Sequence, residues 1–317
     1  MGRAKRIPYG VSDFIDIIER NQYYVDKTMY IPKLEDEPDA LFFIRPRRFG
    51  KSLFISMLRA YYDIKRKDKF DKLFGNLWIG SHPTENQGKY QVLFLDFSKI
   101  GGSIDQLEEN FNAYCNECID SFIETYQEYY PERVVESVLK AKTAARKLNA
   151  IGIAAEKKNL PLYLIVDEYD NFTNVVLNEQ GEEVYTALTH ASGFYREIFK
   201  VFKGMFSKIF MTGVSPVTLD DLTSGFNIGW HISTKPAFNQ MLGFSTEDVR
   251  ELFTYYKENG EIRPDSDVEA IMEEMKPWYD NYCFSRSALK TQSKVFNSDM
   301  VFYYLRNYRE TGEGPEN

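Results

Sequence analysis

Cysteine and histidine are scarce in this 317-residue chain, which has three of each. So few cysteines give no disulfide framework and are typical of a protein in a reducing compartment. The histidines are scattered along the chain without the spacing of metal ligands, at His82, His190 and His231. A histidine metal site is therefore not expected.

Two further absences narrow the class of protein. The longest apolar runs, such as LPLYLIVDEYD at 160–170, are too short to span a bilayer, and MGRAKRIPYG at the N-terminus has no apolar stretch behind its basic residues. These features predict a cytoplasmic protein without a membrane anchor. Basic residues are not in excess either, because the net charge is −8. The net charge thus gives no indication of a nucleic-acid partner. Binding of nucleic acid by a local basic patch stays open as an alternative.

Cys115 and Cys118 form a C-x-x-C pair, and no second pair completes a zinc site. Apolar residues recur around them at helical spacing, namely Leu107, Phe111, Tyr114, Cys118, Phe122 and Tyr126. Free cysteine commonly packs as a small buried hydrophobe. We therefore favour core packing for both thiols over a redox or metal-binding role.

The order of apolar and helical segments predicts an α/β fold. Strand-like runs lie at 40–45, 90–98, 160–170 and 207–216, with a weaker fifth at 227–234. Long helical patterns separate them at 51–65, 103–127, 132–158 and 182–203. Apolar strands that alternate with helices indicate a parallel sheet covered on both faces, and such sheets bind ligands at the carboxyl ends of their strands.

Beyond residue 240 the chain has helical patterns without strand-like runs, which predicts a smaller helical subdomain. Its first helix begins with a capping box from Ser245 to Asp248, and its second is expected to end at Pro277. A short helix near the N-terminus has Ser12 or Asp13 as its N-cap. The expected parts are an N-terminal segment at 1–38 that packs on the core, a core at 39–240, a helical lid at 241–308 and a disordered tail at 309–317.

The stretch RPRRFGKS at 45–52 has the end of a P-loop, the phosphate-binding motif G-x-x-x-x-G-K-[ST]. Gly50, Lys51 and Ser52 stand directly after a strand-like run and before a helical one, as the motif requires. Glycine lets backbone N–H groups close around phosphate oxygens, lysine reaches the outer phosphates and the hydroxyl holds magnesium. Arg45 replaces the first glycine. Taken alone, these residues also fit a surface turn before a capped helix.

A second group of polar residues ends the run LYLIVDEYD, where four apolar residues lead into Asp167 and Glu168. This is the form of a Walker B motif, in which the aspartate holds the magnesium shell and the glutamate orients or deprotonates the attacking water. The alternative is a pair of solvated carboxylates at a strand end. Two strand ends that supply Lys, Ser, Asp and Glu in the expected order favour the nucleotide site.

These residues belong to a wider resemblance. The stretches IPYGVSDF, YYVDKT, FIRPRRFGKSLF, LIVDEYDNF, MTGVSPVTLDDLTSGFNI, FNQMLGF and WYDNYCFS run from residue 7 to about 285, in the order seen in the AAA-ATPase-like family of bacterial proteins. The arginine-rich loop is usual in that family, so Arg45 resembles a family trait. The resemblance implies a P-loop NTPase core with an AAA-like sheet and a helical lid, and an ATP-binding loop made of Arg45, Pro46, Arg47, Arg48, Phe49, Gly50, Lys51, Ser52 and Leu53.

The sequence and the resemblance together predict a magnesium-dependent ATPase, a hydrolase that couples nucleotide state to a partner not identified by the sequence. Lys51 is expected to hold the β and γ phosphates, Ser52 and Asp167 the Mg²⁺, and Glu168 the attacking water. Thr212, at the end of KIFMTGVSP, matches the place where AAA-type ATPases read the γ-phosphate, although threonine is also ordinary turn chemistry there.

Several alternatives stay open. The chain could instead be a nucleotide-gated binding module with little hydrolysis, whereas a small-molecule kinase is disfavoured because Glu168 suits activation of water. Arg47 and Arg48 could contact phosphates or face acidic neighbours, and with Arg196 they are the candidates for an arginine that completes the site. The oligomeric state is also left open.

Three other stretches match family patterns without a clear chemistry. For TSGFN at 223–227 and YDNYCF at 279–284 we favour core packing or domain docking over ligand contact. Many longer relatives in the resembled family carry a nuclease-like domain of the PD-(D/E)-x-K type. The residue types of that motif also occur in this chain, at Pro264, Asp265, Glu274 and Lys276. Because 265–276 reads as one helix, these residues are not expected to converge on a metal. Any such domain is expected beyond Asn317 or not at all.

Overall fold

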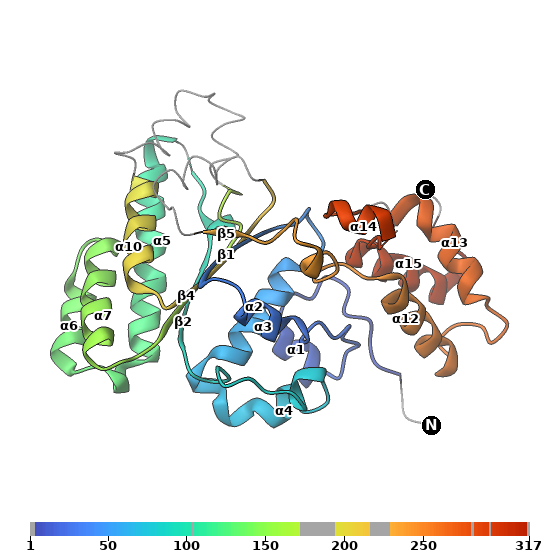
Figure 1. Cartoon of the computed structure of the whole chain (residues 1–317), viewed down its shortest axis with the longest axis horizontal. Helices are drawn as coiled ribbons and strands as arrows, with labels where there is room; N and C mark the ends of the chain where they lie inside the picture. The colour runs from blue at the N-terminus through green and yellow to red at the C-terminus, as the bar shows by residue number, and fades with distance from the viewer. Residues whose placement is uncertain are drawn as a thin grey trace.

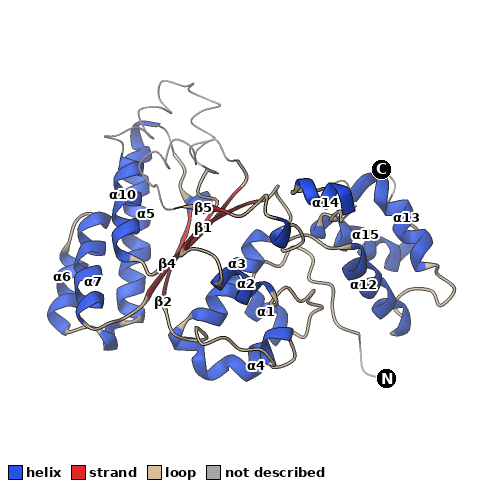
Figure 2. Ribbon diagram, in the orientation of Figure 1, coloured by secondary structure: helices blue, strands red, loops and turns tan. Residues whose placement is uncertain are grey.

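The structure is a computed structural model that describes residues 4–102, 104–171, 194–215, 229–279, 282–291 and 293–315. At its centre is a parallel sheet of five strands in the order β2-β3-β4-β1-β5 (Figures 1 and 2). The strands are β1 (Ala40–Ile44), β2 (Gln91–Asp96), β3 (Leu162–Asp167), β4 (Lys208–Gly213) and β5 (Trp230–His231). The expected α/β fold is therefore confirmed.

The positions of the strands follow from their apolar content. β3 is buried at all six positions, as expected for a strand covered on both faces, whereas the edge strand β2 alternates between buried and partly exposed residues. Each of the four main strand-like runs contains one strand. The weaker run at 227–234 gives β5, which has two residues and pairs with β1 at Leu41 and Phe42.

Helices cover both faces of the sheet, as Figure 1 shows. One face carries α5 (Ile104–Thr125), α6 (Glu132–Lys140), α7 (Ala144–Lys157) and α10 (Phe194–Met205). The other carries α1 (Phe14–Glu19), α2 (Tyr30–Glu35), α3 (Lys51–Tyr62) and α4 (Phe70–Phe74). Short 3-10 helices lie at Ile64–Lys69, Trp78–Gly80, Phe97–Lys99, Gln127–Tyr129 and Pro236–Phe238.

The helical pattern at 132–158 forms two helices, because the chain becomes extended at Ala141 and Thr143. The Thr143 hydroxyl accepts from the Arg146 N–H and begins the second helix. On the same face, Cys115 is fully buried and Cys118 is partly buried against the same apolar core. Burial raises the pKa of the Cys115 thiol.

The helical subdomain lies beside the sheet and has an apolar core of its own (Figure 1). Its helices are α12 (Thr246–Glu258), α13 (Val268–Tyr279), α14 (Arg286–Thr291) and α15 (Ser298–Thr311). The predicted capping box of Ser245 and Asp248 is confirmed. The prediction that the second helix ends at Pro277 is wrong: α13 continues through Pro277 to Tyr279. Proline removes one N–H donor, and it lies close to Tyr279, the last described residue of α13.

Helix α15 extends to Thr311, three residues into the tail expected at 309–317, and its C-cap is Gly312 with φ 81°. Asp265 lies before α13, whereas Glu274 and Lys276 lie on it, so these residues do not occupy adjoining strands. Among the described residues, no helix is both long and apolar enough to cross a membrane.

The N-terminal segment joins the sheet domain to the helical subdomain. Asp13 caps α1, which packs against α3. Further toward the N-terminus, the Lys5 N–H donates to the Tyr255 hydroxyl of α12 (2.9 Å). After α1, Lys27 Nζ donates to Asp248 Oδ2 at 2.6 Å. The segment therefore contacts both parts of the molecule.

Candidate functional site

The predicted phosphate loop follows β1 at the carboxyl edge of the sheet, and α3 begins directly after it at Lys51. Gly50 has φ 85° and ψ 22°, a left-handed conformation that glycine adopts without a steric penalty. Arg48 also has a positive φ of 68°. The loop therefore turns sharply twice before the helix, and it directs the first N–H groups of α3 toward the edge of the sheet.

Lys51 is almost fully buried and bends back over the loop. Its Nζ donates to the carbonyl oxygens of Arg45 (3.0 Å) and Pro46 (3.1 Å). Burial lowers the pKa of Lys51, and the nearby carboxylates of Asp167 and Glu168 oppose that shift. A buried ammonium held by two neutral carbonyls is well placed to exchange them for an anion.

Asp167, at the end of β3, is the centre of the site. It is 3% exposed, and its carboxylate accepts from Ser52 Oγ at 2.6 Å and Thr212 Oγ1 at 2.6 Å. The Glu168 N–H donates to the same carboxylate (3.0 Å). Three elements thus converge, because β3 and β4 are neighbours in register and α3 lies against β3. The sequence could not show this hydrogen-bond network.

Glu168 has a left-handed backbone with φ 49°, which is uncommon for a residue other than glycine. The next residue, Tyr169, donates its N–H to the Thr212 carbonyl at 3.0 Å, so the chain turns from β3 toward β4 here. Burial, and then the charge of Asp167, raise the pKa of the Glu168 carboxyl, whereas Lys51 opposes them. Its environment thus favours a carboxylate that accepts protons more readily than an exposed one.

Two adjoining cavities lie beside these residues. The larger, of about 250 Å³, has the charged side chains of Lys51, Glu168, Arg47, Arg48 and Asp299 in its lining. The other lining residues are Pro8, Gly10, Val11, Ser12, Gly50, Ser52, Leu53, Ser298 and Phe302. The smaller, of about 60 Å³, lies between the N-terminal segment and the helical subdomain. Its lining is mostly apolar and includes Pro8, Tyr23, Tyr24, Leu53, Leu242, Phe244 and Phe302.

The side chain of Arg45 points into neither cavity. It is 1% exposed, and its guanidinium donates to the carbonyl oxygens of Ser233 (2.9 Å) and Phe238 (2.8 Å). Burial lowers the pKa of Arg45. Arg45 is one of the loop residues expected to bind ATP. Its carbonyl group contacts Lys51, but its side chain lies outside both cavities.

The remaining loop residues differ in their exposure and in the cavity that they line. Arg47 and Arg48 are exposed at the larger cavity, and Arg48 Nη1 lies 3.8 Å from Asp299 Oδ2, so Arg48 has an acidic neighbour. Phe49 is buried instead and packs away from the cavity containing Lys51. Leu53 lines both cavities. The side chain of Arg196 and the stretch TSGFN at 223–227 lie outside the described residues.

The sequence missed two polar features of the site. Asp170 is buried, and its carboxylate accepts from the N–H groups of Val214 (3.1 Å) and Ser215 (2.5 Å), which fixes the turn after β3 to the end of β4. The signal was its position, three residues after Asp167. At the other side of the loop, Ser298 Oγ donates to the Arg48 carbonyl at 3.2 Å. No local pattern indicated that contact.

The donor set fits a nucleotide with Mg²⁺. Magnesium prefers hard oxygen ligands, and it usually takes one or two from the protein and the rest from phosphate and water. Ser52 and Asp167 offer one hydroxyl and one carboxylate next to the larger cavity. Among the described residues, no group of three or more His, Cys, Asp or Glu could hold a metal ion by itself.

A parallel sheet with a phosphate-type loop, a buried lysine and an aspartate at its carboxyl edge defines a nucleotide-binding module of the P-loop class. A family model described as predicted AAA-ATPase matches residues 8–223, and the chain belongs to this AAA-ATPase-like family. Membership of this family supports the conclusion that the chain is a nucleotide-binding ATPase module.

Two individual proteins are similar to this chain. One, from Azotobacter chroococcum mcd 1, is described as an uncharacterized protein in the vnfD 5′ region and is 25% identical over 303 residues. That match covers 90% of this chain and 50% of the relative, so the chain spans about half the relative's length. The other is the solved Aeropyrum pernix ORC2 protein (ADPNP-ADP complexes), with 12% identity, a TM-score of 0.33 and coverage of 74% of this chain and 50% of that chain.

Proposed function

We propose that this protein binds ATP with Mg²⁺ at the carboxyl edge of the sheet, hydrolyses it and couples the nucleotide state to a partner. The observation that carries the proposal is the network around Asp167, which joins Ser52 and Thr212 next to a cavity lined by Lys51 and Glu168. In this scheme Lys51 leaves the carbonyls of the loop and donates to the outer phosphates, assisted by the N–H groups that begin α3.

Ser52 and Asp167 would hold the metal, which when bound neutralises charge on the phosphates. Thr212 donates to Asp167 and would keep that carboxylate oriented, and its hydroxyl must turn to reach a γ-phosphate. Glu168 lies beside the same cavity and would accept the proton of the attacking water. The arginines at this cavity, Arg47 and Arg48, would add positive charge near the phosphates.

The base of the nucleotide is expected to enter the apolar cavity between the N-terminal segment and the helical subdomain. The two cavities together come close to the lower end of the roughly 300–1,000 Å³ typical of ligand pockets. The apolar part is therefore too small for a base unless its walls separate. Binding would thus move the N-terminal segment or the helical subdomain, which offers a route from nucleotide to partner.

The test is a titration of ATP with and without Mg²⁺, followed by calorimetry and by molecular mass, together with phosphate release from the same sample. Saturable binding that needs Mg²⁺, with phosphate release, supports the ATPase. Binding without release supports the alternative, a nucleotide-gated module, which the engagement of Lys51 with its own loop favours. Absence of ATP binding contradicts both functions.

A further inference from the structure

Two stretches that are far apart in the sequence meet behind the phosphate loop. The Phe49 ring packs edge-on against Tyr282 (centroids 4.7 Å apart) and Phe284 (5.6 Å), which precede α14 of the helical subdomain. The Phe284 N–H donates to Asn239 Oδ1 at 2.9 Å, and Asn239 in turn donates to the Ser293 carbonyl at 2.8 Å. The back of the loop thus contacts Tyr282 and Phe284, which belong to the stretch YDNYCF at 279–284.

The side chain of Arg45 also contacts both the strand β1 and Phe284 behind the loop. Its guanidinium lies between two rings, 4.1 Å from the centroid of Phe43 and 3.9 Å from that of Phe284. Among the described residues no carboxylate lies within ion-pairing distance of it, so the buried charge depends on carbonyl oxygens and ring faces. A desolvated cation tolerates little displacement from such partners. The position of Phe284 is therefore fixed relative to β1.

We propose that Arg45 and Phe284 are positioning residues that hold the phosphate loop against the helical subdomain, so that the affinity of the loop for phosphates depends on where the subdomain lies. The link to the ligand is short. The carbonyl of Arg45 is one of the two that hold Lys51 Nζ, and the other belongs to Pro46, whose φ is fixed by its ring. A shift of Arg45 therefore moves both partners of the lysine together.

This inference rests on the proposed function, since it assigns the regulation of the same site. By thermodynamic linkage the coupling is reciprocal: if the subdomain changes phosphate affinity, phosphate binding shifts the subdomain. The subdomain also reaches the loop through Ser298 and Asp299 at the exposed Arg48. Two further hydrogen bonds go to backbone carbonyls of the loop, from Asn297 Nδ2 to Arg47 (3.5 Å) and from the Gly243 N–H to Phe49 (3.2 Å), and neither carbonyl holds Lys51. The Arg45 contacts are buried, and they are the better candidates for transmitting a displacement.

The test is a double-mutant cycle on ATP affinity, measured by calorimetry with Mg²⁺ on the full chain. Arg45→Met and Phe284→Leu are each expected to weaken ATP binding roughly tenfold, and the double variant is expected to bind no more weakly than the weaker single variant. Arg45→Lys keeps the charge but loses the forked geometry, and it is expected to act in the same direction if Arg45→Met does not fold.

The matched control is Phe253→Leu, which alters a buried ring in the core of the helical subdomain, 6.1 Å from Tyr304 and away from the loop. It is expected to keep the parent's dissociation constant. Hydrogen exchange supplies a readout that general destabilisation does not mimic. ATP is expected to slow amide exchange at 282–291 in the parent and in Phe253→Leu, but not in Arg45→Met or Phe284→Leu.

Additive losses in the cycle, or no ATP-induced protection at 282–291 in a parent that binds ATP, would overturn the inference while leaving the proposed function intact. A parent that binds no ATP would overturn both. Loss of affinity in Phe253→Leu equal to that in Phe284→Leu would also contradict the inference, because it would assign the effect to loss of subdomain stability.

Discussion

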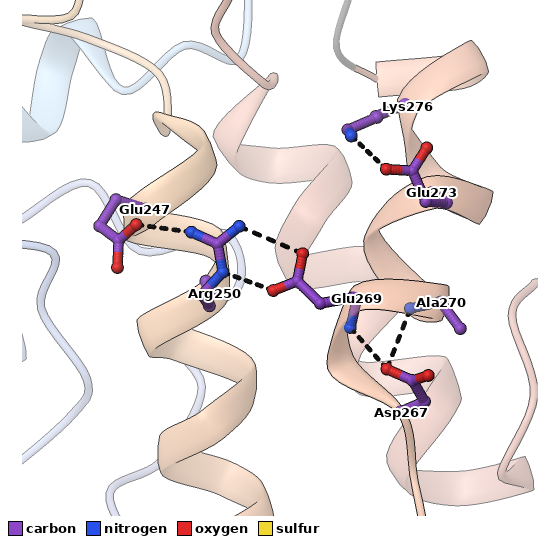
Figure 3. A network of polar contacts seen from close by, with 7 residues as sticks. All are labelled: Glu247, Arg250, Asp267, Glu269, Ala270, Glu273 and Lys276. Carbon is purple, nitrogen blue, oxygen red and sulfur yellow. Dashed lines mark hydrogen bonds and ion pairs between the residues drawn. The ribbon is translucent and has the colours of Figure 1, made fainter.

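The edge of the sheet and the helical subdomain are stabilised in different ways. At the sheet edge, the buried Asp167 has short hydrogen bonds to two neighbouring elements. In the helical subdomain, the ion pairs of Figure 3 are exposed: Arg250 of α12 lies between Glu247 of the same helix and Glu269 of α13, and Lys276 pairs with Glu273 within α13. Exposed ion pairs contribute little to stability, so this subdomain depends on its own apolar core.

The difference indicates which half of the site can adjust. The lysine, the hydroxyls and the carboxylates belong to one framework whose register is set by buried strands. The walls of the apolar cavity come partly from the helical subdomain and the N-terminal segment, which the ion pair of Lys27 with Asp248 joins to each other. We expect Asp167 and Thr212, which the strands hold, to stay in place while the subdomain moves, whereas the carbonyls that hold Lys51 respond to it through Arg45.

The largest effect is expected when the helical subdomain alone is destabilised. Phe253→Ala removes a fully buried ring and is expected to lower that subdomain's free energy of unfolding by about 3–5 kcal/mol. Trp278 of α13 reports on this part, so denaturant unfolding is followed by its fluorescence after Trp78 and Trp230 are changed to Phe. If hydrogen exchange shows β3 and β4 destabilised equally, the two regions unfold as one unit.

The sheet edge is tested at Glu168. Glu168→Gln is expected to slow ATP hydrolysis by roughly 100-fold while ATP affinity stays close to that of the parent, because a general base is lost and the phosphate contacts are kept. Steady-state phosphate release and calorimetry measure the two quantities. Since the pKa of Glu168 is raised, the parent's rate is expected to fall on acidification at a higher pH than for an exposed glutamate. Equal hydrolysis by both proteins would remove Glu168 from the mechanism.

Lys51→Ala probes binding at the same edge. Charge-assisted contacts contribute about 1.5–3 kcal/mol each, so the variant is expected to lose roughly tenfold or more in ATP affinity. The matched control is Lys140→Ala, which removes an exposed lysine on α6. Calorimetry on both variants gives the comparison, and undiminished ATP binding by Lys51→Ala would show that the phosphate-loop assignment is mistaken.

The smallest effect is expected at the exposed network of Figure 3. Arg250→Ala removes both of its ion pairs, yet all three side chains are substantially exposed. The melting temperature is expected to change by less than about 2 °C, and by still less at high salt, where exposed charges are screened. Scanning calorimetry at two salt concentrations measures this. A larger loss would mean that surface charges help to hold the helical subdomain together.

The sequence predicted the parts of the site that depend on chain direction. Polar residues that follow apolar strands must gather at one edge of a parallel sheet, and Ser52, Asp167 and Thr212 do so. Capping residues likewise depend on short-range chemistry, and the box at Ser245 is present. The catalytic and binding roles of these residues stay predictions.

The orientation of Arg45 could not be predicted, because three partners of its side chain are almost two hundred residues away or farther in the sequence. Ser233, Phe238 and Phe284 become neighbours only when the sheet and the helical subdomain have assembled. The end of α13 was mispredicted for a different reason: proline near the end of a helix costs less free energy than proline at its centre. The local sequence around Pro277 does not show how far the helix continues.

The backbone conformation of Glu168 implies a conflict between folding stability and catalytic activity. A left-handed conformation costs a residue with a side chain on the order of 1–2 kcal/mol, whereas glycine adopts it freely. Glu168→Gly would therefore relieve strain and remove a partly desolvated carboxylate, yet the same change would remove the proposed base. A search for more heat-resistant variants should thus recover inactive proteins altered at this position, as expected where a functional group is kept in place at the expense of the fold.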